Sequence, residues 1–353
     1  MLGGGANNLS HAREFIAIGE NLHTTRVLSK KGKRFHVDGG KEYLSYVDSL
    51  GSEGELLIPE EAKSGQDYDQ GRIKHIKIAL QMCMGEFGDE ESGVSYLLSV
   101  IRRQEQFEAD FLDINVDEYS LDQREREDAM EWLAAFVLAN SDLPVAIDSS
   151  ATSVIEVGLA VCARESKPMQ SPLLNSASLE RLDVLDLAAD HGARVIATAS
   201  GDSGMPTDSS SRLENLARMM DAVNDCGIEP SDVFLDPLIF PIAVDGDYGN
   251  HVLETIAGLR SEYGDSVHIT GGFSNVSFGL PERKLINLVF LDLARRAGAD
   301  SGIIDPVALS AEVQQGLDRD SRSFRLAENV LSGGDRDCSE YLKAWRKKEL
   351  VSL

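Results

Sequence analysis

The stretch PVAIDSSATSVIEVGLAVCA, residues 144–163, holds the pattern that decides the fold of this chain. A short apolar run, Pro144–Asp148, ends in polar residues and leads into a helical pattern over Ala151–Ala163, with Val154 and Leu159 on one face. The run is not cleanly alternating, as expected for a parallel strand that is buried on both faces. The stretch therefore predicts one strand–turn–helix unit of an α/β protein.

The same unit recurs along the chain. Helical patterns over Leu179–His191, Ser211–Cys226 and Leu285–Arg296 lie between further apolar runs. Eight strands with intervening helices favour a closed (β/α)₈ TIM barrel over an open doubly wound sheet, and no GxGxxG follows the first run. The other seven predicted strands are Phe15–Glu20, Phe111–Val116, Pro172–Ser176, Arg194–Ser200, Val233–Ile239, Val267–Ser274 and Ser301–Pro306.

One long segment interrupts this rhythm, because about ninety residues separate the first run from the second. Lys30–Gln70 is polar, with a basic cluster at residues 30–34, whereas Arg72–Met84 and Gly93–Phe107 have helical patterns. We expect residues 1–353 to form a single barrel, with residues 24–107 as an insertion or small subdomain after the first strand. A disordered excursion is the alternative that the sequence leaves open.

The amino-acid composition disfavours several classes of function. The 353 residues carry a net charge of −25, which disfavours nucleic-acid and membrane partners because phosphate backbones and anionic lipids are repelled. No apolar run is long enough to span a bilayer, and the N-terminus lacks a signal-peptide pattern. The four cysteines are far apart, which argues against a zinc cluster or a disulfide framework. We therefore expect a cytoplasmic protein without a bound metal.

The carboxyl ends of the predicted strands are unusually polar. In a barrel these ends meet at one face, where active sites lie. A single aspartate there is often only a helix N-cap, but several together favour a site for a heterocycle rich in N–H and C=O groups. The polar strand ends include Glu20, Asp113, Asn115, Asp148, Asn175, Asp236, Ser274, Asn275 and Asp305.

Several of these ends resemble a known family in order and spacing. The chain resembles the pterin-binding methyltransferases, which include methyltetrahydrofolate:corrinoid/iron–sulfur protein methyltransferase and the folate-binding module of cobalamin-dependent methionine synthase. The resemblance covers Phe15–Glu20 and everything from residue 108 onward. The strings that carry it are LDINV at 112–116, IDS at 147–149, LNS at 174–176, LDPLI at 235–239, GFSNVS at 272–277, PERKLIN at 281–287 and ADSGIID at 299–305.

The resemblance implies a role in one-carbon metabolism: transfer of a methyl group between N5 of tetrahydrofolate and the cobalt of a corrinoid. It also implies site residues by position. Asp148, Asn175 and Asp236 would hold the pterin ring, and Asn275 would sit beside N5 as its hydrogen-bond partner. The surrounding positions would be lined by Asp113, Asn115, Gly272, Ser274 and Glu20. Methyltetrahydrofolate is then the substrate, and the direction of transfer is not readable from the sequence.

Partners follow from the same resemblance. The chain contains no cobalamin-binding DxHxxG pattern, so a separate corrinoid protein would carry the cobalt. Members of the family form dimers, which implies a homodimer. A polyanionic folate tail would need a local positive patch on this acidic chain, for which Lys30–Arg34 is the candidate segment, although a solvated loop is the simpler interpretation.

The chain also departs from the family pattern. His23 stands where an Asn is usual, and could be a proton donor, a metal ligand with Glu20 or, as we expect, a loop histidine. Asp202 replaces a family Lys, and the long insertion is unusual. Two other functions remain open. The first is that of a dihydropteroate synthase-like pterin enzyme, against which the Ser274–Ser277 stretch counts, and the second is that of a non-catalytic pterin-binding subunit.

Overall fold

Eight parallel strands form one sheet in the computed structural model, which describes residues 15–48, 50–165, 170–202 and 204–350. The sheet order is β12-β11-β10-β9-β8-β7-β1-β13. Backbone hydrogen bonds from Asp300 to Ile269 (3.3 Å) and from Ile303 to Gly271 (3.0 Å) join β13 to β12, so the sheet closes on itself. The predicted (β/α)₈ barrel is confirmed. The N-terminal residues on which the signal-peptide prediction rests lie outside the described residues.

The barrel strands match the predicted runs closely. They are β1 (Ile16–His23), β7 (Phe111–Asn115), β8 (Val145–Asp148), β9 (Leu173–Ala177), β10 (Arg194–Thr198), β11 (Val233–Asp236), β12 (His268–Ile269) and β13 (Ser301–Ile304). The predicted strand Val267–Ser274 is wrong in its second half. After Ile269 the chain turns at two glycines and enters a 3₁₀ helix, Phe273–Ser277, because residues without side chains hold a strand weakly.

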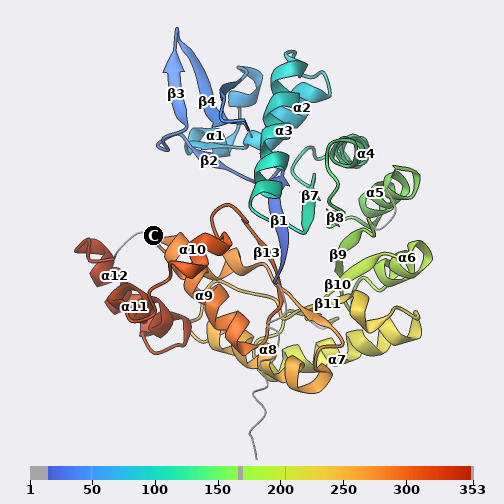
Figure 1. The fold of residues 1–353 in the computed structure, drawn as a ribbon, viewed down its shortest axis with the longest axis vertical. Helices are drawn as coiled ribbons and strands as arrows, with labels where there is room; N and C mark the ends of the chain where they lie inside the picture. Colours follow the sequence, from blue (N-terminus) through green and yellow to red (C-terminus); the bar gives the residue numbers. More distant parts are fainter. Residues whose placement is uncertain (1–14, 49, 166–169, 203, 351–353) are drawn as a thin grey trace, which may run out of the picture.

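Helices surround the barrel in a ring, and each packs an apolar face on the strands (Figure 1). Asp122 and Asp208 cap α4 and α7 by accepting hydrogen bonds from the first backbone N–H groups, which explains where these helices begin. The ring consists of α3 (Glu90–Gln106), α4 (Gln123–Asn140), α5 (Thr152–Glu165), α6 (Asp183–His191), α7 (Ser209–Asp225), α8 (Tyr248–Tyr263), α9 (Arg283–Ala297) and α11 (Arg322–Leu331), with α10 (Ala311–Gln315) and α12 (Ser339–Arg346) outside it.

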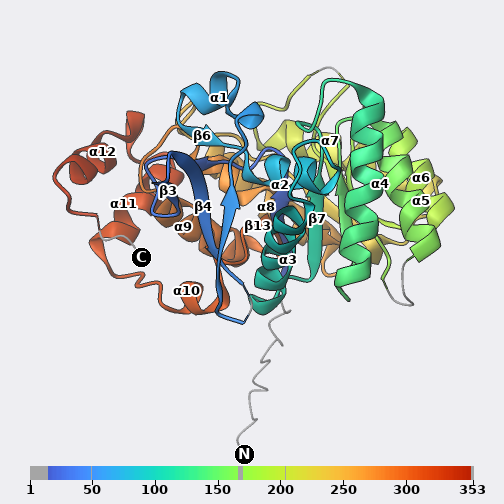
Figure 2. The same cartoon turned by 90° about the horizontal axis from the view of Figure 1, so that it is seen from above.

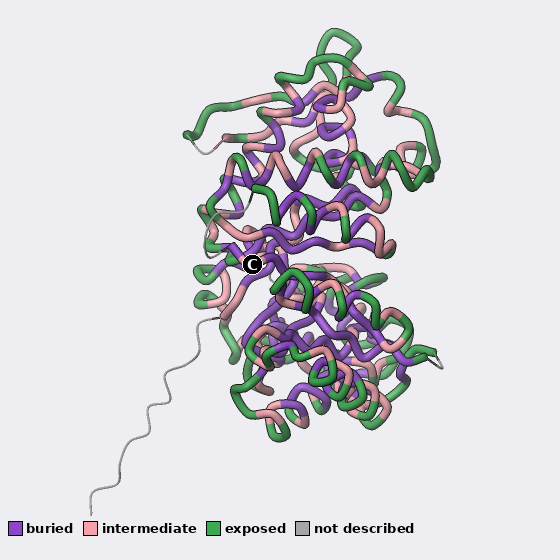
Figure 3. The backbone as a smooth tube through the Cα atoms, turned by 90° about the vertical axis from the view of Figure 1, so that its right-hand side faces the viewer, coloured by how far each residue is buried: buried purple, intermediate pink, exposed green. Residues whose placement is uncertain are grey.

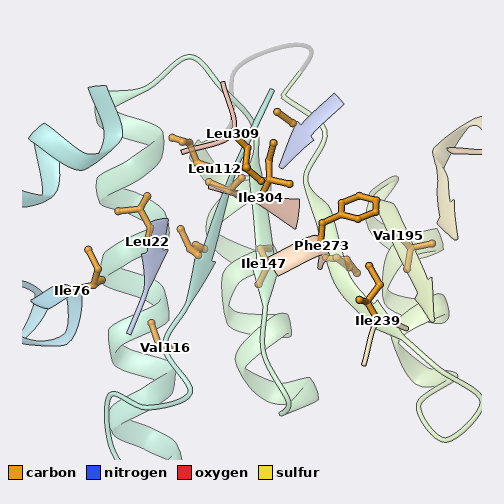
Figure 4. Close-up of a cluster of buried hydrophobic side chains, with 14 of the residues drawn as sticks. Leu22, Ile76, Leu112, Val116, Ile147, Val195, Ile239, Phe273, Ile304 and Leu309 are labelled. Carbon is orange, nitrogen blue, oxygen red and sulfur yellow. The ribbon is translucent and has the colours of Figure 1, made fainter. Parts of the chain in front are cut away.

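Two apolar cores hold this arrangement. A small core fills the barrel, to which seven strands contribute one residue each: Ile18, Phe111, Ala146, Leu173, Ile196, Phe234 and Ile303. A larger core lies between strands and helices, and Figure 4 shows part of it, including Leu112 on β7 and Ile147 on β8. Figure 3 shows buried segments inside and exposed turns at the periphery. Each fully buried side chain of this size contributes about 1.5–3 kcal/mol.

The segment between β1 and β7 is folded, which answers the question that the sequence left open. It contains a three-stranded antiparallel sheet beside α3 (Figures 1 and 2). Its elements are β2 (Leu28–Ser29), β3 (Phe35–Asp38), β4 (Lys41–Val47), β5 (Glu53–Leu57), η1 (Glu61–Lys63), α1 (Gln66–Asp69), β6 (Arg72–Ile73) and α2 (His75–Cys83).

A close approach fixes α3 against the first strand. Gly19 lies so near Gln104 of α3 that an added Cβ would sit 2.4 Å from the amide oxygen. That oxygen accepts a hydrogen bond from the backbone N–H of Asn21 at 3.2 Å. Only glycine admits this contact, which places the insertion at the edge of the barrel near the end of β1. None of the helices in the described ranges has the length and apolar character to cross a bilayer.

Candidate functional site

Strand alternation places polar side chains directly above the apolar barrel core. Residues two positions apart on a strand point to the same side. The position two after Phe111 is Asp113, and the same step leads from Ala146 to Asp148 and onward around the barrel. We call the resulting polar end of the barrel the barrel mouth. It includes Glu20, Asp113, Asp148, Asn175, Thr198, Asp236 and Asp305.

The first strand breaks the alternation in a way that adds a histidine to the barrel mouth. The pairing of β1 with β7 shifts register between Gly19 and Leu22, which marks a bulge. Glu20 and His23 are an odd number of residues apart, yet both contact side chains of the mouth. His23 Nε2 lies 3.2 Å from Asp113 Oδ2, and Glu20 accepts a hydrogen bond from Ser274 Oγ at 3.4 Å. The prediction that His23 is a loop residue is therefore wrong.

Hydrogen bonds link polar groups of β7 to those of β8 and β9. Asn175 Nδ2 donates to Asp113 Oδ2 at 3.3 Å, and Asn115 Nδ2 donates to Asp148 Oδ2 at 2.9 Å. Asp113 is fully buried, and its Oδ1 has no hydrogen-bond partner among the described residues. Buried polar atoms are nearly always paired, so this oxygen is available to an N–H group of a ligand.

Burial sets the protonation of the carboxyl groups. Burial raises the pKa of Asp148 to about 7, and the charge of Asp113 adds to this effect. Burial likewise raises the pKa of Asp236 to about 6, although the Leu238 N–H and Arg212 oppose it. Each of these two groups can thus gain or lose a proton near neutral pH.

His23 supplies the positive charge that these acids require. Burial disfavours its protonation, but the charge of Asp113, together with those of Asp148 and Glu20, raises its pKa to about 9. The contact with Asp113 is an ion pair rather than an aligned hydrogen bond, since Nε2 has no partner in hydrogen-bonding geometry. In its protonated form His23 offsets the charge of Asp113 inside the barrel.

Among the described residues, His23, Asp113 and Asp148 form the group that could hold a metal ion. Each of these residues offers one ligand atom, and the three atoms lie within 4.8 Å of one another. A protonated His23 cannot coordinate a metal, because both ring nitrogens then carry hydrogen. This set differs from the alternative raised by the sequence, in which His23 and Glu20 would be the metal ligands.

The turn after β11 fixes the position of the Asp236 carboxylate. Asp236 was predicted from the sequence, but the residues that support this turn were not. Its Oδ1 accepts the backbone N–H of Leu238 at 2.8 Å, and Leu238 has a left-handed backbone with φ 59°. The fully buried Arg212 of α7 donates to the carbonyl oxygen of Pro237 at 2.9 Å. Arg212 belongs to an ordinary helical pattern in the sequence, so no local signal distinguishes it as a support of the site.

The segment after β12 forms one wall of the barrel mouth and carries Asn275, the amide predicted from the sequence to be the partner of N5. A Cβ on Gly272 would lie 3.0 Å from Asn275 Nδ2, so the glycine leaves room for that amide. The Asn275 side chain has no hydrogen-bond partner among the described residues, and it follows Ser274, which contacts Glu20. The amide can therefore donate to or accept from a bound molecule.

Hydrogen bonds link two groups of the predicted site residues: one pairs Asn115 with Asp148 and Asn175 with Asp113, and the other joins Ser274 to Glu20. Arg26, absent from the predicted set, bridges Glu20 and Asp305 at 3.0 Å each. Asp202 is exposed and pairs with Arg218 of α7 at 2.7 Å, so this acid is engaged at the surface.

Comparison with known proteins gives the following relatives. A methylcorrinoid:tetrahydrofolate methyltransferase of Eubacterium limosum is 28% identical over 228 residues, covering 63% of this chain and 78% of that protein. A methionine synthase of Mycobacterium tuberculosis is 30% identical over 222 residues, covering 59% of this chain but 18% of that much longer protein. A solved dihydropteroate synthetase superposes with a TM-score of 0.50 at 16% identity, over 64% of this chain and 88% of the other, which shows the fold alone.

The family model described as "Pterin binding enzyme" matches residues 88–305, which is more than half of the chain. The match runs from α3 to the end of β13 and so includes every strand of the barrel except β1. It contains the carboxylates and amides of β7, β8, β9 and β11 and the wall after β12. On this match, and with those groups gathered at one mouth, the chain belongs to the family of pterin binding enzymes.

Proposed function

We propose that this protein is a methyltransferase that moves a methyl group between N5 of tetrahydrofolate and the cobalt of a corrinoid protein. The observation that carries the proposal is the free amide of Asn275 on the wall of a barrel mouth lined by buried carboxylates. The methyltransferase of Eubacterium limosum, whose name contains both substrates, supports this reaction over others in the family.

The pterin ring would be held by the acids and amides of the barrel mouth. A pterin presents neighbouring N–H groups along one edge, and carboxylates accept such paired donors well. Asp148, Asn175 and Asp236 are the proposed ring contacts, with Asp113 and Asn115 below them. The unpaired Asp113 Oδ1 is a buried acceptor that suits a ligand rich in N–H groups.

Asn275 is the proposed catalytic group. In the transfer, the bond between the methyl carbon and N5 breaks while a bond to cobalt forms, or the reverse. The corrinoid of the partner protein supplies or accepts the methyl group. N5 is a poor leaving group unless it gains a proton, so an amide that accepts a hydrogen bond from protonated N5 binds most strongly as that charge develops. Direction is set by the methyl donor that is present.

The surroundings of the reaction follow from the same proposal. A separate corrinoid protein must reach the barrel mouth, and Glu20, Ser274 and Asn275 lie on the wall that it would face. We further propose a homodimer in the cytoplasm, with residues 24–107 acting as a subdomain of the single barrel. Size-exclusion chromatography with light scattering measures the number of chains directly.

The test is calorimetric titration of the whole protein with methyltetrahydrofolate, followed by addition of cobalt(I) cobalamin while its absorbance is recorded. Binding at micromolar concentration with conversion to methylcobalamin is the expected result. Failure to bind any reduced folate would overturn the proposal. Condensation of p-aminobenzoate with a dihydropterin pyrophosphate would favour the synthase-like alternative. Binding of folate and of a corrinoid protein without methyl transfer would favour a non-catalytic subunit.

A further inference from the structure

A cavity of about 590 Å³ lies between the insertion and the edge of the barrel. Its walls come from the end of β1, the following loop, strands β4 and β5, helix α3 and the segment after β13. We call it the insertion cavity. None of the proposed pterin contacts lines it, and Asp305 is the residue of the barrel mouth that it shares.

Basic side chains line the insertion cavity although the chain as a whole is strongly acidic. The chain has 34 Lys and Arg against 59 Asp and Glu, yet four of these cations meet here: Arg26, Lys33, Arg34 and Arg103. Arg26 is neutralised by Glu20 and Asp305, and Arg34 donates to the hydroxyl of Tyr96 at 2.8 Å.

The remaining two cations are free to bind. Lys33 and Arg103 are exposed, and neither has an ion pair or side-chain hydrogen bond with any residue in the described ranges. They belong to different elements, the loop before β3 and helix α3, and both line the same cavity. Of the three acids in the lining, Glu55 contacts His36 at 3.0 Å and Asp305 contacts Arg26, while Glu53 is exposed and forms no ion pair with Lys33 or Arg103.

An aromatic wall accompanies these cations. Tyr46 lines the insertion cavity and packs edge-on against Tyr96, with ring centroids 5.0 Å apart. Val27 and Val47, both about half exposed, also line it. Burial lowers the pKa of His75 well below its usual value, so its ring is neutral. The cavity therefore offers an apolar wall together with positive charge, which suits an aromatic molecule that carries carboxylates.

A chain of contacts connects the insertion cavity to the barrel mouth. Ser274, next to Asn275, donates to Glu20, which pairs with Arg26 in the cavity lining. Asn21 and Asp305 line the cavity and hydrogen-bond to each other at 3.0 Å. A molecule whose ring lies in the mouth beside Asn275 thus has an adjoining site for its other end.

We propose that the insertion cavity binds the benzoyl-glutamate tail of the folate, with Lys33 and Arg103 holding its carboxylates. This inference rests on the proposed function, because it assumes that the pterin lies in the barrel mouth. Each further γ-linked glutamate adds a carboxylate. The cavity therefore selects folates that carry several glutamates over those that carry one.

The experiment compares the affinities of methyltetrahydrofolate with one glutamate and with three, measured by calorimetry at fixed salt on the full chain. We expect the triglutamate to bind about fivefold more tightly, because its two additional carboxylates reach Lys33 and Arg103 and two exposed ion pairs provide a gain of this size. The double variant Lys33→Gln/Arg103→Gln should lose this gain. The matched control Lys31→Gln/Arg102→Gln removes the same charge at neighbouring exposed positions outside the cavity lining and should keep it.

The outcomes separate this inference from the proposed function. Equal binding of the two folates by the wild type would overturn the tail site while leaving the methyltransferase proposal in place. A gain that persists in the Lys33→Gln/Arg103→Gln variant would also overturn the assignment to this cavity. Absence of binding by either folate would overturn both proposals. Because both residues are exposed and unpaired, melting curves of the variants should match the wild type.

Discussion

The barrel mouth and the insertion cavity use charge in opposite ways. In the mouth Asp113 and Asp236 are buried, Asp113 fully so, and the counter-charge of Asp113 comes from His23 inside the same site. In the insertion cavity Lys33 and Arg103 are exposed and have no partner in the described chain. The comparison shows that burial tunes protonation, whereas exposure leaves a charge available to a ligand.

The two regions should therefore respond differently to substitution. Groups of the mouth are coupled through short contacts, so removal of one changes the protonation and position of the others. The cations of the cavity act separately, so their effects should be small and should add. The following predictions test this contrast.

The largest effect is expected at Asn275. Removing a hydrogen-bond partner that acts in the transition state typically costs about 100- to 1000-fold in rate. We expect Asn275→Ala to lower the rate of methyl transfer by this amount while folate affinity changes much less, as measured by single-turnover absorbance and calorimetry. Asn224→Ala, exposed at the far end of α7, serves as the control. Equal losses in rate and affinity would refute the role proposed for Asn275.

A smaller effect, on binding, is expected at Asp236. Its carboxylate is the proposed acceptor of pterin N–H groups, and loss of a buried charge-assisted hydrogen bond costs about 1–3 kcal/mol. Asp236→Ala should therefore weaken folate binding by about 5- to 150-fold in calorimetry. Asp232 lies just before the same strand, at the opposite end of the barrel, so the control variant Asp232→Ala should bind folate normally. Unchanged affinity of Asp236→Ala would remove Asp236 from the site.

The next prediction concerns the pH dependence of stability. The pKa of His23 is raised to about 9, so the folded protein holds a proton there that the unfolded chain releases near pH 6.5. The stabilisation is complete below pH 6.5 and is lost as the pH rises through 9. The groups that face His23 are Glu20, Asp113 and Asp148. We expect the melting temperature to fall by a few degrees between pH 6.5 and 9.5 for this reason.

Replacement of His23 tests the assignment. His23→Gln should flatten the fall in melting temperature over this pH range, whereas His36→Gln in the insertion should leave it unchanged, because the contact of His36 with Glu55 is largely exposed. A fall of equal size in the His23→Gln variant and the wild type would show that another group titrates.

The smallest expected effect is that of a chelator. If the His23 imidazolium neutralises the carboxylates, EDTA should change neither folate affinity nor melting temperature at pH 7. A loss of either quantity that zinc or magnesium restores would mean instead that His23, Asp113 and Asp148 hold a cation.

Much of the barrel could be predicted from sequence because buried parallel strands leave a strong local pattern. The run at Val145–Asp148 and the helical face with Val154 and Leu159 are examples. Local sequence patterns gave wrong predictions where the position of a residue depends on contacts with residues far away in the chain. The strand after Val267 ends early at Ile269, and His23 lies on a strand because the bulge in β1 extends the pairing with β7.

The sequence by itself determined the order of strands and helices and the set of polar residues that follow the strands. These properties arise from periodicity and from short-range preferences, which are written locally in the chain. The tertiary structure alone decided that His23 meets Asp113, that Arg212 supports the turn after Asp236, and that Lys33 and Arg103 face one cavity. Each of these arrangements involves residues far apart in the chain. Only closure of the barrel and packing of the insertion on α3 bring such residues together.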